Sequence, residues 1–174
     1  YVHGMFQSVY DYPYLSSSAN HIFDITIGFD EGSPLSGSTI VQESKKINLY
    51  NQMAQVLVGH DHLGAVLRFD QDGDIFSGGT KLHECFFLNF SRLLTKDEIK
   101  KGSFEMVLGM SGGYALDGTM FQGLRVKVAD TNASTNYRTN SPAGEYGVLT
   151  ASNDTGSPLK SNNVNCGLIF YQAG

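Results

Sequence analysis

Cysteine, proline and long hydrophobic runs are all scarce in this sequence. Its 174 residues include two Cys and four Pro, and two cysteines cannot form the disulfide framework of a small secreted scaffold. No apolar run approaches the roughly 18 residues that a membrane-spanning helix needs, so we expect no membrane partner. Phosphate-binding signatures are missing too, because residues 78–81 lack the spacing of a phosphate loop. We therefore expect no cofactor.

Positive charge is missing from the first quarter of the chain. Residues 1–44 contain five acids and no Lys or Arg, whereas residues 45–174 contain twelve of each, so the whole net charge of −5 lies in the first quarter. A nucleic-acid surface needs clustered Lys and Arg to displace counterions. We therefore expect no nucleic-acid partner. The five acids are Asp11, Asp24, Asp30, Glu31 and Glu43.

Small polar and turn-forming residues make up a third of the chain. Gly, Ser, Asn and Thr supply 20, 17, 11 and 10 residues, and they are dispersed between short apolar segments instead of being pooled in one linker. This distribution favours one β-rich domain over residues 1–174 with frequent reversals. We predict an α+β fold of six to eight strands, as a mainly antiparallel sheet or sandwich, with one long and one short helix.

The clearest predicted strand covers residues 22–29, where apolar residues alternate with small or polar ones. A period of two over this length predicts that the face carrying Phe23, Ile25, Ile27 and Phe29 is buried. All four prolines fall outside the predicted strands, as expected for segments that need every backbone donor. The further strands are predicted at residues 64–69, 83–90, 103–109, 120–128, 144–151 and 165–172.

Two segments have helical rather than β periodicity. From Ser44 to Val58 apolar residues recur at three- and four-residue steps, Ser44 is positioned to cap the first turn, and Gly59 follows as a left-handed terminator. We predict an amphipathic helix there. Residues 95–98 (TKDE) form a capping box, which predicts a short helix between the two neighbouring strands.

One serine has some of the surroundings of a catalytic nucleophile. Residues 109–113 (GMSGG) fit the pattern that exposes a serine between a strand and a helix, but the required general-base histidine should come later, and every histidine precedes Ser111. We interpret the segment as a glycine-rich turn, with a hydrolase built on Ser111 or scattered carboxylates as a less favoured alternative. Cys85 and Cys166 lie in apolar strands and are predicted to be buried, inert thiols. The sequence thus predicts no enzyme and no catalytic residues.

Two polar clusters match metal-binding loops in part. Residues 70–74 (DQDGD) place carboxylates at alternate positions, as an EF-hand does, but Ile75 and Lys81 replace the glycine and the closing glutamate of that loop. We interpret this segment as an ordinary turn, with adventitious calcium as the alternative. Residues 60–62 (HDH) lack a third ligand and are interpreted as a solvated loop. We predict no metal site.

Aromatic residues are concentrated at the N-terminal end. Residues 1–29 hold seven of the twenty aromatics, and three tyrosines alternate between residues 10 and 14. The sequence leaves two interpretations open. The tyrosines pack on the core at a sheet edge, or they dock a neighbouring subunit, because tyrosine is enriched at interfaces. Under the second interpretation, the candidate interface residues are Tyr10, Asp11, Tyr12, Tyr14 and Glu31.

Five strings along the chain have a family likeness. They are residues 7–21 (QSVYDYPYLSSSANH), 46–57 (KINLYNQMAQVL), 92–104 (RLLTKDEIKKGSF), 140–147 (NSPAGEYG) and 167–174 (GLIFYQAG). Together they resemble a virion structural protein of contractile-tailed marine phages of the cyanophage type. The resemblance spans most of residues 7–174 and implies a structural role without catalytic residues. Because such proteins are longer than this chain, we expect it to be a segment of a longer polypeptide.

The residues and the resemblance together predict an assembly domain of a phage virion. We expect a capsid or tail component, located in the virion, whose partners are other virion proteins and copies of itself. A homo-oligomer is the expected state. The alternative is a receptor- or glycan-binding module of a tail fibre or baseplate, in which tyrosine-rich loops stack on sugars.

Overall fold

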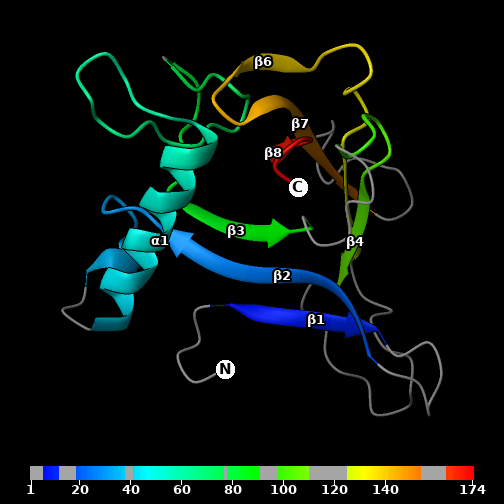
Figure 1. Ribbon diagram of the computed structural model, residues 1–174, viewed down its shortest axis with the longest axis horizontal. Coiled ribbons are helices and arrows are strands. Elements are labelled where there is room, and N and C mark those ends of the chain that lie inside the picture. Colours follow the sequence, from blue (N-terminus) through cyan, green and yellow to red (C-terminus); the bar gives the residue numbers. More distant parts are fainter. Residues whose placement is uncertain are drawn as a thin grey trace.

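The computed structural model describes residues 6–11, 19–37, 41–76, 78–90, 98–109, 125–153 and 164–174. Two antiparallel sheets and one α-helix organise this part of the chain (Figure 1), which confirms the β-rich α+β class. The first sheet has the strand order β1-β2-β3, and the helix α1 packs against β2. These elements are β1 (Gln7–Asp11), β2 (Asn20–Phe29), the short 3-10 helix η1 (Pro34–Ser36), α1 (Val41–Leu57) and β3 (Glu84–Asn89).

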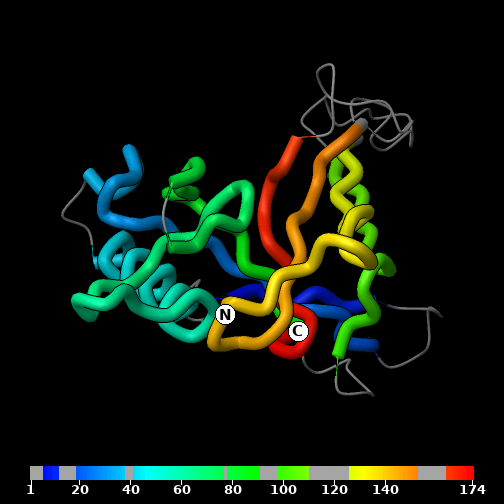
Figure 2. The backbone as a smooth tube through the Cα atoms, turned by 90° about the horizontal axis from the view of Figure 1, so that it is seen from above, coloured from blue at the N-terminus to red at the C-terminus, as the bar shows by residue number. Residues whose placement is uncertain are grey.

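The second sheet is built around β7 (Gly144–Asn153). Along one edge of β7 runs β8 (Val164–Phe170), and the other edge is shared by β5 (Arg125–Ala129) and β6 (Arg138–Ser141). Next to β5 lies β4 (Glu105–Gly109), an outer strand of this sheet. Figures 1 and 2 show β7 and β8 running steeply across the direction of β2 and β3. The two sheets therefore cross instead of stacking in parallel.

Most of the predicted strands are confirmed. The segments predicted at 22–29, 83–90, 103–109, 144–151 and 165–172 correspond to β2, β3, β4, β7 and β8. β5 overlaps the C-terminal part of the segment predicted at 120–128, whose residues 120–124 lie outside the described residues. The sequence does not predict β1 and β6. Both are short, and neither has the alternating apolar residues that mark a half-buried strand.

The prediction of a strand at residues 64–69 is wrong. Within this segment only Val66 takes part in a β-bridge, and that bridge is isolated. The reason lies in a turn just before it, where Asp61 Oδ1 accepts hydrogen bonds from the amides of Leu63 and Ala65, both at 2.8 Å. These amides are satisfied by a nearby side chain, so the start of the segment is not available to a neighbouring strand.

The long helix begins earlier than predicted and ends close to where predicted. Ser44 lies inside α1 rather than at its N-cap. After the helix, Gly59 has a φ of +92°, and its amide donates to the carbonyl of Ala54 at 2.9 Å, which is the predicted left-handed termination. Of the predicted short helix, residues 95–97 lie outside the described residues, and residues 98–102 include a bend and a turn but no helix.

The helix covers the face of β2 opposite to the one that its alternation predicts to be buried. Thr26 and Gly28 lie on the helix side and are buried. On the face predicted to be buried, Phe29 is buried, whereas Phe23, Ile25 and Ile27 are only partly buried. Close packing explains the difference, because a Cβ at Gly28 would lie 3.1 Å from the backbone nitrogen of Tyr50. Only small residues let the helix approach the strand so closely.

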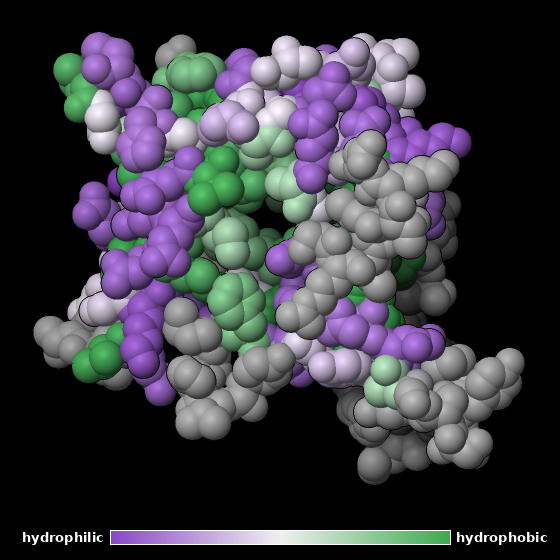
Figure 3. Space-filling model, in the orientation of Figure 1, coloured by the Kyte–Doolittle hydropathy of each residue, from purple (hydrophilic) through white to green (hydrophobic). Residues whose placement is uncertain are grey.

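The main hydrophobic core lies where α1, the first sheet and the β7–β8 pair meet. Tyr50 of α1 and Phe69 meet edge to face with ring centroids 5.4 Å apart, and Phe87 of β3 packs against both. The stacked pair of Tyr146 and Phe170 joins this cluster from the second sheet. Figure 3 shows α1 as a hydrophilic outer layer and, beside it, a hollow in which hydrophobic side chains are visible.

A buried carboxylate shapes the turn at residues 70–74. Asp70 is 0% exposed, and its Oδ1 atom accepts hydrogen bonds from the amides of Asp72 and Asp74, both at 2.9 Å. Its Oδ2 atom lies 3.3 Å from Nζ of Lys81 but has no hydrogen-bond partner among the described residues, so this ion pair acts by charge rather than by an aligned hydrogen bond. The prediction of an ordinary turn is confirmed.

The same turn connects the first half of the chain to the second sheet. The carbonyl of Gly73 accepts hydrogen bonds from the Arg138 guanidinium at 2.6 Å and from the Tyr146 hydroxyl at 3.0 Å. The side-chain amide of Asn165 donates to Asp72 Oδ1 at 2.6 Å. The Asp70 turn is therefore in contact with β6, β7 and β8.

Replacing Asp70 with alanine is expected to lower the free energy of unfolding by about 3 kcal/mol, because the amides of Asp72 and Asp74 lose their acceptor and the Lys81 ammonium loses the buried carboxylate with which it pairs. Urea unfolding followed by circular dichroism measures this loss. Asp74→Ala is the matched control. It removes a half-exposed carboxylate that pairs with Arg138 and is expected to cost less than about 1 kcal/mol. Equal losses in the two variants would contradict the role given to Asp70.

Candidate functional site

The candidate interface residues do not form one patch among the described residues. Tyr10, which is 48% exposed, and Asp11 lie on β1 beside the beginning of β2. Glu31 follows the far end of β2, and the ten residues of that strand span about 33 Å. Tyr12 and Tyr14 lie outside the described residues.

The other candidates from the sequence have separate outcomes. Ser111 lies outside the described residues. Residues 60–62 lie in a loop with both histidines exposed, as predicted. The hydrogen bond from the amide of Ala65 is the main cause that holds the pKa of Asp61 below its usual range. Cys85 is partly buried, but Cys166 is exposed on β8, so the prediction of a buried thiol is wrong there.

Two searches of the described ranges were negative. Within them, no group of three or more His, Cys, Asp or Glu side chains is arranged to hold a metal ion. In the same ranges, no helix combines the length and the apolar character that crossing a membrane requires.

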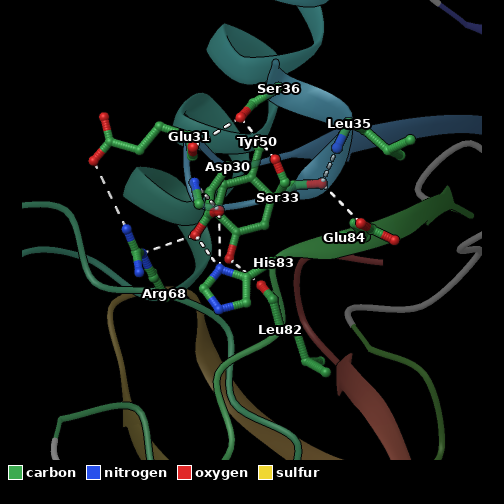
Figure 4. A network of polar contacts seen from close by, with 11 residues as sticks. Asp30, Glu31, Ser33, Leu35, Ser36, Tyr50, Arg68, Leu82, His83 and Glu84 are labelled. Carbon is green, nitrogen blue, oxygen red and sulfur yellow. Dashed lines mark hydrogen bonds and ion pairs between the residues drawn. The ribbon is translucent and has the colours of Figure 1, made fainter.

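Asp30, directly after β2, is the centre of a polar network (Figure 4). Its side chain is 4% exposed. The carboxylate lies 2.8 Å from Nε of Arg68 and 2.9 Å from Nδ1 of His83, and it accepts a hydrogen bond from the amide of Gly32 at 2.8 Å. The Asp30 amide donates to the carbonyl of His83 at 2.9 Å. A buried carboxylate is stable only when it is paired and hydrogen-bonded in this way.

The network orients the imidazole of His83. Because Nδ1 faces the Asp30 carboxylate, we assign the ring hydrogen to Nδ1. The other ring nitrogen, Nε2, does not contact Asp30, and the side chain is 44% exposed. No Ser, Thr or Cys side chain in the described ranges is hydrogen-bonded to His83. The described geometry therefore holds an oriented histidine without the adjacent nucleophile that acyl transfer needs.

Further hydrogen bonds fix the loop after β2 and the helix to β3 (Figure 4). Ser33 Oγ donates to Glu84 at 2.7 Å and accepts the amide of Leu35 at 3.1 Å, which caps η1. The buried Tyr50 hydroxyl donates to the carbonyl of Leu82 at 2.6 Å. The loop and α1 are thus held against the same end of β3.

Beside the Asp30 network lies a cleft of about 490 Å³, between α1 and the loop around Arg68. A volume of this size is typical of small-molecule sites. Polar groups on its lining include Glu31, Asn51, Gln55 and Arg68, and Phe76 adds an exposed aromatic ring. We take the cleft and the Asp30 network together as the candidate functional site.

Sequence reasoning does not find this site. Asp30 and His83 are 53 residues apart, and the cleft draws its walls from four separate segments. The one available signal is an aspartate that directly follows an apolar strand and precedes Glu31 and Gly32. By itself that signal indicates only a turn.

Comparisons of the chain with protein-family models, with curated proteins and with solved structures found no significant match. The resemblance to phage virion proteins therefore stays a prediction from the sequence strings.

Raising the pH is expected to destabilise the protein through groups around this site. Burial, helped by the charge of Asp30, raises the pKa of the Cys85 thiol from 9.0 to about 12, and burial raises the pKa of Tyr50 as well. As the pH rises, these groups ionise in the unfolded chain at a lower pH than in the folded protein. The free energy of unfolding therefore keeps its full value below about pH 9 and falls as the pH rises towards about 12.

For Cys85 alone the expected loss between about pH 8 and pH 10.5 is about 2 kcal/mol. Urea unfolding at the two pH values measures the total loss, and the Cys85→Ala variant should show a smaller one than the parent. An unfolding free energy that is the same at both pH values would contradict the raised pKa of these groups.

Proposed function

We propose that this domain is a structural building block of a phage virion, which acts by assembly and has no catalytic activity. Its partners are copies of itself or neighbouring virion proteins, and neither nucleic acid nor membrane is among them. The resemblance supports the virion context. The observation that carries the assembly role is the outward face of the first sheet.

The outward face is the side of β1, β2 and β3 that points away from α1. Strand register places Val9 beside Phe23, and Ile27 beside Phe86. Phe86 is 70% exposed and lies on β3, an outer strand of the described sheet. We define the outward face as Val9, Phe23, Ile25, Ile27, Phe86 and Leu88. Phe86 is exposed and the other five are partly buried, with Phe23 packed against the Phe90 ring.

Contiguous apolar side chains on one sheet face favour contact with another protein. Burying a phenylalanine side chain completely contributes about 2 kcal/mol. At the margins of the face stand the polar residues Gln7 and Glu84, both exposed, so an apolar centre has a polar rim, as protein interfaces do. In the described part of the sheet, β1 is an outer strand. Its exposed Tyr10 contacts the His21 ring and lies on the opposite side of the strand from Val9, so it is not part of the outward face.

Phe86→Asp is the variant that tests the assembly role. The unmodified chain is expected to have, in light scattering, a mass that is a multiple of 19.0 kDa, and the variant is expected to shift towards the single chain. A central aromatic contact contributes at least about 2 kcal/mol to association, so the dissociation constant should rise about thirtyfold or more.

Val56→Ser is the matched control, because Val56 is 66% exposed but lies on α1. It should leave the mass unchanged. Asp11→Lys separately tests the β1 end of the surface and is expected to weaken association less than Phe86→Asp. A parent chain that stays monomeric at every concentration, or equal effects of Phe86→Asp and Val56→Ser, would contradict the proposal.

A further inference from the structure

Two side chains on α1 offer unused hydrogen-bonding groups to the cleft. Asn51 and Gln55 are one helical turn apart and both line it, so their side chains lie on the same side of the helix. No hydrogen bond joins either side-chain amide to another residue in the described ranges. Each amide supplies two donors and an acceptor. Glu31, 86% exposed and 3.8 Å from Arg68, adds a solvated acceptor.

An aromatic ring forms an apolar part of the same cleft. Phe76 is 59% exposed, whereas its neighbour Ile75 is 1% exposed and anchors the segment in the core. Because Ile75 is fixed inside, Phe76 is held at the cleft as a flat apolar surface. Such a surface gains most from a ligand that is apolar on one face and polar at its edges.

The charges of the cleft argue against an ionic ligand. The Arg68 guanidinium is paired with Asp30 at 2.8 Å. The Lys81 ammonium contacts the carbonyl of Asp74 at 2.5 Å and the carboxylate of Asp70 at 3.3 Å. A phosphate or sulfate group would have to compete with these carboxylates for both cations, whereas an uncharged ligand would not.

We propose that this cleft binds a neutral sugar residue. A pyranose ring has C–H groups on its faces, which suit the Phe76 ring, and hydroxyl groups at its edges that both donate and accept. These hydroxyls match the free amides of Asn51 and Gln55 and the carboxylate of Glu31. The volume of about 490 Å³ lies within the range of sites for ligands of this class.

This inference goes beyond the assembly role and uses none of the residues of the outward face. It gives the glycan-binding alternative a defined place in the fold. The two activities are compatible, because the cleft is formed by α1 and the segments around Arg68 and Phe76, whereas the assembly surface lies on the other side of the first sheet.

Calorimetric titration of the full 174-residue chain with neutral oligosaccharides that end in glucose, galactose, mannose or N-acetylglucosamine tests the proposal. Sialylated and phosphorylated counterparts form the comparison set. At least one neutral sugar is expected to bind more tightly than its charged counterparts. Phe76→Ala and the double variant Asn51→Ala, Gln55→Ala are each expected to weaken that binding about tenfold, as the loss of one or two good contacts does.

Val56→Ser, on the same helix but outside the cleft, should bind the sugar like the parent. Thermal unfolding of each variant verifies that the fold is intact, which is expected because the changed side chains are not in the core. Phe86→Asp should also leave sugar binding unchanged, so failure of assembly and failure of sugar binding are separate results. No binding to any neutral sugar, a preference for charged ones, or unaltered binding by the cleft variants would overturn the proposal.

Discussion

The burial of the Asp70 carboxylate is the constraint on which both the joint between the sheets and the cleft depend. A buried charge is tolerated only with partners, and two amides of its own turn and the Lys81 ammonium provide them. Satisfying Asp70 therefore fixes the path of the chain from Phe69 to Leu82. The two ends of this segment are also hydrogen-bonded, because the amide of Leu82 donates to the carbonyl of Phe69 at 2.9 Å. Even Gly79 follows from this arrangement, since a Cβ there would collide with the carboxylate.

The same solution recurs at Asp30 and Asp130. Each aspartate directly follows a strand, is almost completely buried, and accepts hydrogen bonds from backbone amides. For Asp130 these are the amides of Gly102 and Phe104, at 2.8 and 2.9 Å. Carboxylates thus end β2 and β5 by binding the amides of the loops around them. Residues 1–44 therefore place less negative charge at the surface than their five acids suggest, because Asp30 is buried and paired with Arg68.

Local signals explain which parts of the fold the sequence predicts. The alternation in β2 and the left-handed Gly59 depend on a few neighbouring residues, so both are correctly predicted. The buried side of β2 is not a local property. It depends on how closely α1 approaches Gly28. The helix side is therefore lined by the small residues Thr26 and Gly28, while Ile25 and Ile27 on the other side are only partly buried.

The candidate site is unpredictable for a related reason. Its groups are ordinary residues in sequence, and they acquire a common environment only after β2, α1 and β3 have packed together. Arg68 illustrates this, because it lies in a segment predicted as a strand and is instead a loop residue aimed at Asp30. Pairing over such sequence distances is set by tertiary packing, which a single sequence pattern does not encode.

Lys81 supplies the positive charge that the Asp70 carboxylate needs. In a calcium loop the counterion comes from solution, so the stability of the folded state rises with the logarithm of ion concentration. Here the counterion is covalently part of the chain, and its ammonium contacts both Asp70 and the carbonyl of Asp74. The charge of Asp70 is therefore balanced from within the chain itself.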